Sequence, residues 1–173
     1  MSLLKRAAKK ILSPVVFVFL SSIKNKFINS LKGKTTHSAF DEEIIIKKYL
    51  DNLPLENNYC VDIAASDGIT MSNTYSFFKN TWQGMAVEYN PIKFAELANS
   101  YRKFSNVSLL KVKVIPENIL SVLGACLCPK DFAFLSFDID SYDYFVLEKL
   151  LSEFRPRLIC TEINENIPPP YKF

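Results

Sequence analysis

Short apolar segments alternate with longer mixed segments from Pro54 to the end of the chain. The apolar segments have the length of buried strands, and the mixed segments are typical of helices. The predicted strands are Tyr59–Ile63, Gly84–Glu88, Val107 to about Val112, Phe132–Phe137 and Arg157–Glu162. The predicted helices are Met71–Asn80, Pro91–Arg102, Glu117–Leu123 and Ser141–Glu153. This order predicts an α/β fold with a Rossmann-like, doubly wound parallel sheet covered by helices on both faces.

The N-terminal segment has a different pattern. From Leu3 to Val15 the apolar residues recur at helical spacing, which predicts an amphipathic helix. The polar face of this helix carries four basic residues, Lys5, Arg6, Lys9 and Lys10. The uncharged run Ile11–Ile23 has only 13 residues, whereas a membrane-spanning helix needs roughly 20. Pro14 also interrupts the run, so the pattern argues against a membrane-spanning helix.

Three interpretations of this basic arm stay open. In the first, residues 3–28 bind an anionic membrane surface, and the protein is peripheral at the membrane. In the second, the helix packs on the domain or on another protein. In the third, the segment is a secretory signal, although no small-residue cleavage site follows Leu20.

Residues 33–37 are typical of a linker. They divide the chain into an arm with its linker, 1–37, and a domain, 38–173. Ser38 and Asp41 predict a capping box at the start of the domain, which begins a helix that reaches about Leu50.

The composition suits one compact domain with an appended arm, because 49% of the 173 residues are hydrophobic and 23% are charged. The net charge of +3 is unevenly distributed. Met1–Phe40 holds eight Lys or Arg residues and no acid, while the remainder carries 13 bases and 18 acids, a net charge of −5. An acidic domain argues against nucleic acid as its main partner, because phosphate binding needs concentrated positive charge.

The chain has four cysteines, Cys60, Cys126, Cys128 and Cys160. They lie within or beside apolar runs and lack the C-x-x-C spacing of zinc and redox sites. This distribution predicts buried, reduced thiols in a cytoplasmic protein.

The first predicted strand and its turn read YCVDIAASDGIT. A dinucleotide-binding turn uses three glycines to bring its backbone close to a pyrophosphate, but here Ala64 stands where the first glycine is usual. Asp62 and Asp67 flank the turn, and two carboxylates would repel a diphosphate. The turn therefore favours a ligand that is cationic or neutral at this point. S-adenosylmethionine has an ammonium, a sulfonium, a ribose and an adenine, but no phosphate.

Glu88 ends the second predicted strand, 20 residues after Gly68. In nucleotide-binding folds an acid at this position accepts hydrogen bonds from ribose hydroxyls. The alternative is an ordinary polar residue at the end of a strand. The turn and Glu88 together indicate a nucleoside-containing cofactor more strongly than either does alone.

Five segments resemble class I S-adenosylmethionine-dependent methyltransferases, in particular the FkbM-like group. They are VDIAASDG, SNT at Ser72–Thr74, WQGMAVEYNP, LSFDIDSYDYFVLEKL and RPRLICTEIN, and they occur in the order typical of that family. The resemblance covers about Asn58 to Asn164. It implies an O-methyltransferase that acts on a hydroxyl of a saccharide or a small metabolite, with S-adenosylmethionine as cofactor.

The same resemblance implies a set of cofactor-binding residues. By that resemblance, the methionine part would lie against the turn after the first strand, and Glu88 would bind the ribose. Tyr89 and Asn90 would flank the adenosine, Val114 would approach the adenine, and Asp138 would lie near the transferred methyl group. The turn residues in this set are Asp62, Ala64, Ser66, Asp67 and Gly68.

A second group of acids follows the fourth and fifth predicted strands. Asp138 and Asp140 project to the same side, and Glu162 and Asn164 end the fifth strand. Clustered carboxylates share a proton, pair with a cation or bind a metal. Two alternatives remain. One is a divalent metal, because the arrangement loosely resembles the magnesium site of catechol-type methyltransferases, and the other is a structural role at helix N-termini. We favour direct binding of substrate hydroxyls or of the cofactor ammonium, and we assign no metal ligand.

Methyl transfer to a hydroxyl needs a proton acceptor beside the hydroxyl oxygen. The only histidine, His37, lies in the predicted linker, which argues against a histidine base. Asp138 or Asp140 is therefore the predicted catalytic base.

Class I methyltransferase sheets usually have seven strands, and five are predicted here, so we expect a truncated sheet or one completed by another chain. Two rival functions stay open. A metal-dependent glycosyltransferase would use Asp138 and Asp140 as a D-x-D pair, which leaves Glu88 without a role. A catalytically inert, membrane-tethered binding domain would keep the fold and use the arm for localisation.

Overall fold

Five parallel strands form one sheet, in the order β3-β2-β1-β4-β5, in the part of the chain that the structure describes. The structure is a computed structural model, and it describes residues 37–38, 42–139 and 143–161. The strands are β1 (Tyr59–Ile63), β2 (Gln83–Val87), β3 (Val107–Leu110), β4 (Phe134–Phe137) and β5 (Leu158–Thr161). The α/β class and the doubly wound parallel sheet predicted from the alternation of segments are confirmed.

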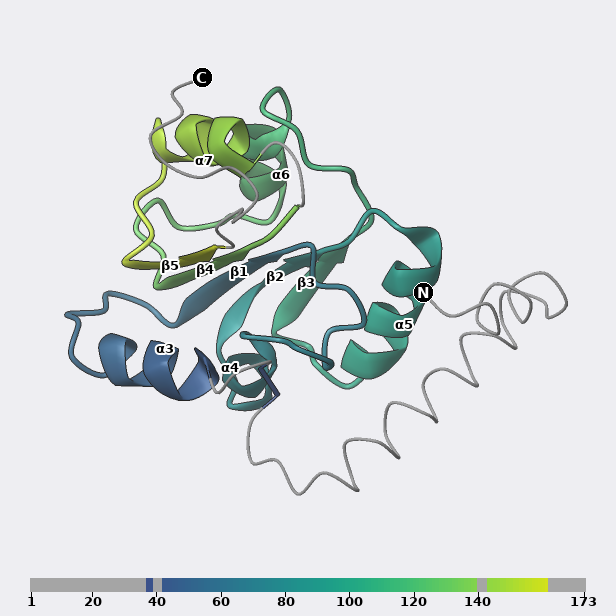
Figure 1. Cartoon of the computed structure of the whole chain (residues 1–173), viewed down its shortest axis with the longest axis horizontal. Coiled ribbons are helices and arrows are strands. Elements are labelled where there is room, and N and C mark those ends of the chain that lie inside the picture. Colours follow the sequence, from purple (N-terminus) through teal and green to yellow (C-terminus); the bar gives the residue numbers. More distant parts are fainter. Residues whose placement is uncertain (1–36, 39–41, 140–142, 162–173) are drawn as a thin grey trace, which may run out of the picture.

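Helices cover both faces of this sheet (Figure 1). They are α3 (Glu42–Leu50), α4 (Tyr75–Lys79), α5 (Pro91–Tyr101), α6 (Ile119–Ala125) and α7 (Asp143–Leu151). The first three lie on one face, and α6 and α7 lie on the other. The helix predicted over Met71–Asn80 is only five residues long. Met71 has a φ of 60°, which a right-handed helix does not allow, so the helix begins only at Tyr75.

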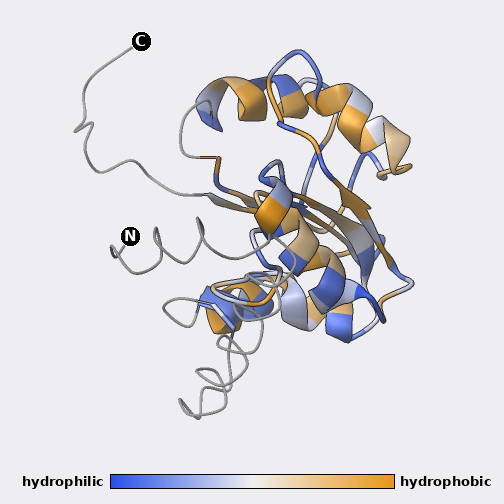
Figure 2. Ribbon diagram, turned by 90° about the vertical axis from the view of Figure 1, so that its right-hand side faces the viewer, coloured by the Kyte–Doolittle hydropathy of each residue, from blue (hydrophilic) through white to orange (hydrophobic). Residues whose placement is uncertain are grey.

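Each face of the sheet has its own apolar core, because successive side chains of a strand point to opposite faces. In β1, Val61 and Ile63 belong to the cluster under α6 and α7, and Cys60 belongs to the cluster under α3, α4 and α5. Figure 2 shows the apolar strands between the two helical layers. All five residues of β1 are buried, as expected for the central strand.

Gly84 allows α4 to approach the sheet closely. A Cβ atom on Gly84 would lie 2.0 Å from the backbone oxygen of Cys60 and 2.7 Å from a ring carbon of Phe78. No side chain fits in that space, so this position of β2 requires glycine.

A cap at the start of α3 differs in detail from the predicted one. The Ser38 hydroxyl accepts a hydrogen bond from the Glu43 amide at 3.1 Å, and the Glu43 carboxylate accepts one from the His37 amide at 2.8 Å. The acid that completes the motif is thus Glu43, whereas Asp41, which was predicted for this role, lies outside the described residues. His37 belongs to this cap.

The predicted arm lies outside the described residues, apart from His37. Within the described ranges, no helix is long and apolar enough to cross a membrane. The four cysteines are all described and all free; Cys60 and Cys128 are buried, and Cys126 and Cys160 are partly buried.

Candidate cofactor site

The turn after β1 folds over the end of β2. The amides of Ala64 and Ala65 both donate to the carbonyl oxygen of Val87, at 2.9 and 3.0 Å. Ala64, Ser66 and Gly68 have φ angles of 69°, 52° and 77°. Three left-handed residues within five positions make the chain turn sharply at the carboxyl edge of the sheet. Ala64 therefore takes the conformation for which glycine is usual, with its methyl group exposed.

Gly68 meets α5, and this contact explains why the residue is glycine. A Cβ atom at Gly68 would lie 2.5 Å from Leu97 and 2.6 Å from the ring of Tyr101. The Tyr101 hydroxyl donates to the Gly68 carbonyl oxygen at 2.8 Å. Burial raises the pKa of Tyr101 far above its ordinary value, so the hydroxyl keeps its proton and remains a donor. Gly68 thus fixes the turn against the helix.

Glu88 joins the turns that follow β1 and β2. One carboxylate oxygen accepts from the Ser66 amide at 2.9 Å, and the other accepts from the Asn90 amide at 2.7 Å. The side chain is 6% exposed. Each carboxylate oxygen has two lone pairs, so both can accept a further hydrogen bond. A buried carboxylate held from two sides is a rigid acceptor at this edge of the sheet.

A cavity of about 470 Å³ lies at the carboxyl ends of β1, β2, β3 and β4. Its polar or charged side chains are those of Ser66, Glu88, Tyr89, Lys113 and Asp138. The other lining residues are Ile63, Ala64, Val87, Val112, Val114 and Ile139. Its volume is in the range of small-molecule and cofactor sites. In doubly wound sheets, ligands bind at this edge.

Asp62 lies behind the turn, outside the cavity lining. It follows Cys60 by two positions, so its side chain points toward the face covered by α3, α4 and α5. The Thr74 hydroxyl donates to its carboxylate at 2.5 Å. Burial raises the pKa of Asp62 to about 6; the Glu88 carboxylate adds to this rise, and the Thr74 hydrogen bond opposes it. Asp62 is therefore partly protonated near neutral pH.

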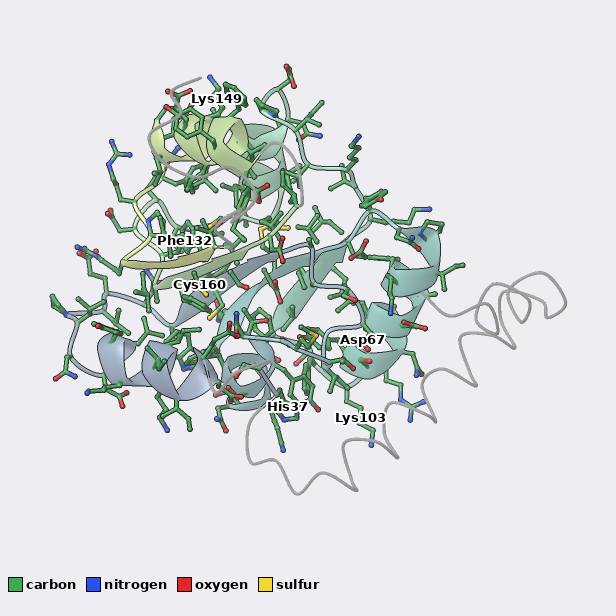
Figure 3. All side chains as sticks on the ribbon, in the orientation of Figure 1. His37, Asp67, Lys103, Phe132, Lys149 and Cys160 are labelled. Carbon is green, nitrogen blue, oxygen red and sulfur yellow. The ribbon has the colours of Figure 1, made fainter. Side chains whose placement is uncertain are left out.

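Two other predicted cofactor residues stabilise local backbone. The Asp67 carboxylate accepts from the amides of Ile69 and Thr70, at 2.9 and 2.7 Å, and so stabilises the turn. Asp67 lies beside α5 in Figure 3. The Asn90 side chain caps α5 by accepting from the amides at positions 92 and 93, at 3.0 and 3.3 Å.

The segment Ser72–Thr74 connects the site to β5. The Ser72 hydroxyl accepts from the amides of Thr74 and Tyr75, at 3.2 and 3.0 Å. The Asn73 amide nitrogen lies 3.6 Å from the sulfur of Cys160, the β5 residue labelled in Figure 3. The Asn73 amide oxygen is buried and has no hydrogen-bond partner among the described residues. A buried oxygen without a hydrogen bond lowers the stability of the fold.

The structure brings six of the predicted site residues to one cavity. They are Ala64, Ser66, Glu88, Tyr89, Val114 and Asp138. Asp62, Asp67, Gly68 and Asn90 lie outside its lining and support the turns that form it. Asp140, Glu162 and Asn164 lie outside the described residues. No group of three or more potential metal ligands occurs in the described ranges.

Several lining residues were not predicted from the sequence. Four of them are apolar residues at or after strand ends: Ile63, Val87, Val112 and Ile139. The predicted strand ends of a Rossmann-like fold were enough to identify them. Lys113 had no distinguishing signal, because one lysine in a loop resembles any exposed lysine. Of the described residues that line the cavity, it is the only one with a basic side chain.

The chain has the Rossmann-like fold found in class I methyltransferases. A candidate O-methyltransferase from Klebsiella pneumoniae is 16% identical, with a TM-score of 0.50, over 90% of this chain and 69% of that chain. Precorrin-6y C5,15-methyltransferase from Geobacter metallireducens is 16% identical, with a TM-score of 0.48, over 68% of this chain and 60% of that one. No protein-family model and no curated protein matches the sequence.

A third similar structure is a methyltransferase from Geobacter sulfurreducens in complex with S-adenosyl-L-homocysteine. It is 10% identical, with a TM-score of 0.47, over 75% of this chain and 51% of that chain. This chain thus spans 60% of the Geobacter metallireducens protein and 51% of the Geobacter sulfurreducens protein. The similarity to the Klebsiella pneumoniae protein, at 16% identity, concerns the fold alone.

Proposed function

We propose that the protein is an S-adenosylmethionine-dependent methyltransferase that methylates a hydroxyl of a saccharide or a small metabolite. The observation that supports this most directly is Glu88, a buried carboxylate that lines a cavity at the carboxyl edge of the sheet. An acid at the end of the second strand of such a fold binds ribose hydroxyls. Membership of the FkbM-like group and a cytoplasmic location belong to the same proposal, and they rest on the sequence.

The charges around the cavity fit this cofactor. Glu88 and Asp138 contribute two carboxylates to the lining, and Lys113 contributes one ammonium group. Carboxylates attract the ammonium and sulfonium of S-adenosylmethionine, whereas they repel the diphosphate of a dinucleotide. Buried Asp62 adds a third acid directly behind the turn.

The side chains can be given roles in methyl transfer. S-adenosylmethionine supplies a methyl group on a sulfonium. Glu88 binds and orients the ribose, and the apolar strand-end residues exclude water from the cavity. Asp138 would accept the proton of the acceptor hydroxyl as its oxygen bonds to the methyl carbon and the carbon–sulfur bond breaks, which leaves S-adenosylhomocysteine. Asp140, the other candidate base, lies outside the described residues.

The first test is calorimetric titration with S-adenosylhomocysteine, with NADH and a nucleotide sugar plus manganese as comparisons. We expect saturable binding of S-adenosylhomocysteine alone. Glu88→Ala should weaken this binding by about 1.5 to 3 kcal/mol, because a charge-assisted hydrogen bond is lost. Glu88 also accepts hydrogen bonds from two backbone amides, so Glu88→Ala removes support from both turns. Glu88→Gln is therefore measured as well, because glutamine keeps one acceptor oxygen.

Glu56→Gln is the matched control for this test. Glu56 precedes β1, is 67% exposed and forms an ion pair with Arg157, so it lies at the opposite edge of the sheet. The control should bind S-adenosylhomocysteine as the wild type does. Equal affinity of the wild type and both Glu88 variants would show that Glu88 does not bind the ribose.

The two rival functions predict different results. A glycosyltransferase would bind the nucleotide sugar in the presence of manganese and would not need Glu88. An inert binding domain would bind S-adenosylhomocysteine but transfer no labelled methyl group from S-adenosylmethionine to any of a panel of saccharides and small alcohols.

A further inference from the structure

The outer face of α3 exposes three large apolar side chains. Ile44, Ile45 and Tyr49 are 57%, 55% and 60% exposed, while Ile46 and Leu50 are buried against the domain. Ile45 and Tyr49 are four residues apart, so they lie one above the other, and Ile44 begins the adjacent row. Single exposed apolar residues are common on protein surfaces, but three on two turns of one helix form a continuous patch.

Two lysines accompany this patch. Lys48 is four residues after Ile44 and therefore lies in the patch, and Lys47 borders it. Both lysines are exposed, and neither belongs to the three ion pairs of the described ranges. The acids of α3 are at its start, where both are partly buried, and Glu43 accepts from the His37 amide. Asp51, exposed just after the helix, lies one turn beyond the two lysines. The outer face is thus apolar, with two bases and, at its C-terminal end, one acid.

The position of α3 adds a third observation. The helix packs against the edge strand β5, at the outer end of its helical layer (Figure 1). In the sequence, Met1–Phe40, which has eight basic residues and no acid, precedes the helix, and Asp41 lies between them. The helix is thus preceded in the sequence by a segment that an anionic surface attracts.

We propose that the outer face of α3, formed by Ile44, Ile45, Lys48 and Tyr49, docks on the surface of an anionic lipid bilayer. Apolar side chains of an interfacial helix enter the boundary between headgroups and acyl chains, and tyrosine favours this boundary. Lysines keep their charged ends at the level of the headgroup phosphates. The basic N-terminal segment adds attraction to the same surface.

A second copy of the chain fits this face less well. In a symmetric dimer the same patch would meet itself, so the two copies of Lys48 would be enclosed near each other within an apolar contact. Two enclosed ammonium groups lose their hydration and repel each other, which is unfavourable. Anionic headgroups supply the missing negative charge.

The test is flotation of the full chain with vesicles of phosphatidylglycerol and phosphatidylcholine in equal amounts, or of phosphatidylcholine alone. The wild type should bind the anionic vesicles, and added salt should weaken the binding. Combined Ile44→Ser, Ile45→Ser and Tyr49→Ser substitutions should lower the partition coefficient by at least about tenfold, because binding scales with the apolar area inserted. Lys47→Gln with Lys48→Gln should lower it less.

The matched control is Tyr144→Ser with Phe145→Ser. These side chains are 66% and 49% exposed and lie on α7, on the opposite face of the sheet. This variant should bind vesicles as the wild type does. All the substituted side chains are exposed, and circular dichroism checks that the variants remain folded.

Several outcomes would overturn the proposal. They are a wild type that does not float with anionic vesicles, a triple variant that binds as well as the wild type, and a control that loses binding equally. Sedimentation velocity without lipid tests whether the chain forms a dimer. If the wild type is a dimer, and the triple variant is a monomer that still binds vesicles, then the face binds a second copy of the chain. Vesicle binding needs no cofactor, so its outcome is independent of the proposed methyl transfer.

Discussion

At the scale of single residues, the turn after β1 keeps the backbone conformation of a glycine motif although one of its glycines is replaced. Ala64 stands where a glycine is usual, yet it has a φ of 69°. A left-handed alanine costs about 1 kcal/mol or more. The two hydrogen bonds from Ala64 and Ala65 to the Val87 carbonyl hold the chain in that conformation. The departure from the glycine pattern is therefore local strain that the neighbouring strand offsets.

Asp62 gives a pH-dependent prediction. Its pKa is raised from 3.8 in the unfolded chain to about 6 by burial. Between these values the folded state binds more protons, so this residue stabilises the fold below about pH 4, and that stability is lost as pH rises through 6. Asp62→Asn mimics the neutral form and keeps an oxygen for Thr74. It should raise the free energy of unfolding by about 2 to 3 kcal/mol above pH 7 and change it little below pH 4.

The measurement is urea unfolding of the wild type and Asp62→Asn across this pH range. Asp51→Asn, the same change at an exposed position, is the control and should show no such difference. Parallel stability curves for the wild type and Asp62→Asn would contradict the assignment. If Asp62 also stabilises the cofactor ammonium, the stabilised variant should bind S-adenosylhomocysteine more weakly.

At the scale of elements, Gly84 gives a prediction about close packing. Gly84→Ala would place a methyl group 2.0 Å from the backbone oxygen of Cys60, and a backbone atom in the central strand cannot move aside easily. This substitution should lower the free energy of unfolding by at least about 2 kcal/mol. Gly124→Ala is the control. Gly124 lies in α6 with nothing within 4 Å of the added atom, so alanine should stabilise the helix by about 0.5 to 1 kcal/mol.

Chemical denaturation measures both glycine variants. Equal stability of Gly84→Ala and the wild type would mean that β1 and α4 do not approach Gly84 as closely as the structure shows. A destabilised Gly124→Ala would indicate that a further contact covers α6.

The elements could be predicted from the sequence because periodicity is a property of each segment alone. All five strands were found, since each is a short apolar run. The helix over Met71–Asn80 was predicted too long. The backbone conformation of Met71 and the hydrogen bonds that the Ser72 hydroxyl accepts depend on local backbone geometry, which hydrophobic spacing does not reveal. For the same reason, Asp67 and Asn90 were assigned to the cofactor, although their oxygens accept from nearby backbone amides.

The site could be predicted only in part. Glu88 was found because a strand end fixes its position, and strand ends were the reliable part of the prediction. The resemblance placed Asp62 against the cofactor, but in the structure its side chain points toward α4. Alternate residues of a strand point to the same face, so the position of Asp62 two residues after Cys60 already indicates this direction. Lys113 was missed, since its place in the lining depends on how the loop after β3 folds back over the sheet.

At the scale of the whole molecule, sheet order determines which parts resist opening. β1 pairs on both sides, with β2 and β4, and is buried throughout, whereas β3 and β5 each pair on one side among the described residues and are mostly half-buried. Backbone amides exchange with solvent through openings whose free energy rises with burial and pairing. Hydrogen exchange should therefore be slowest in β1, β2 and β4, which pair on both sides, and faster in the two outer strands.

S-adenosylhomocysteine should change this exchange pattern at one edge of the sheet only. The amides of Ser66 and Asn90 both donate to Glu88, so a ligand held by that carboxylate opposes the opening of both turns. Their exchange should slow when the ligand is added at a large excess over its dissociation constant. Residues 126–128, before β4 at the opposite edge, serve as the internal control and should not change. Slower exchange at that edge would mean that the ligand binds elsewhere. Equal slowing throughout the sheet would mean that the ligand stabilises the fold only globally. Either result would contradict the assignment of the cavity beside Glu88 as the cofactor site.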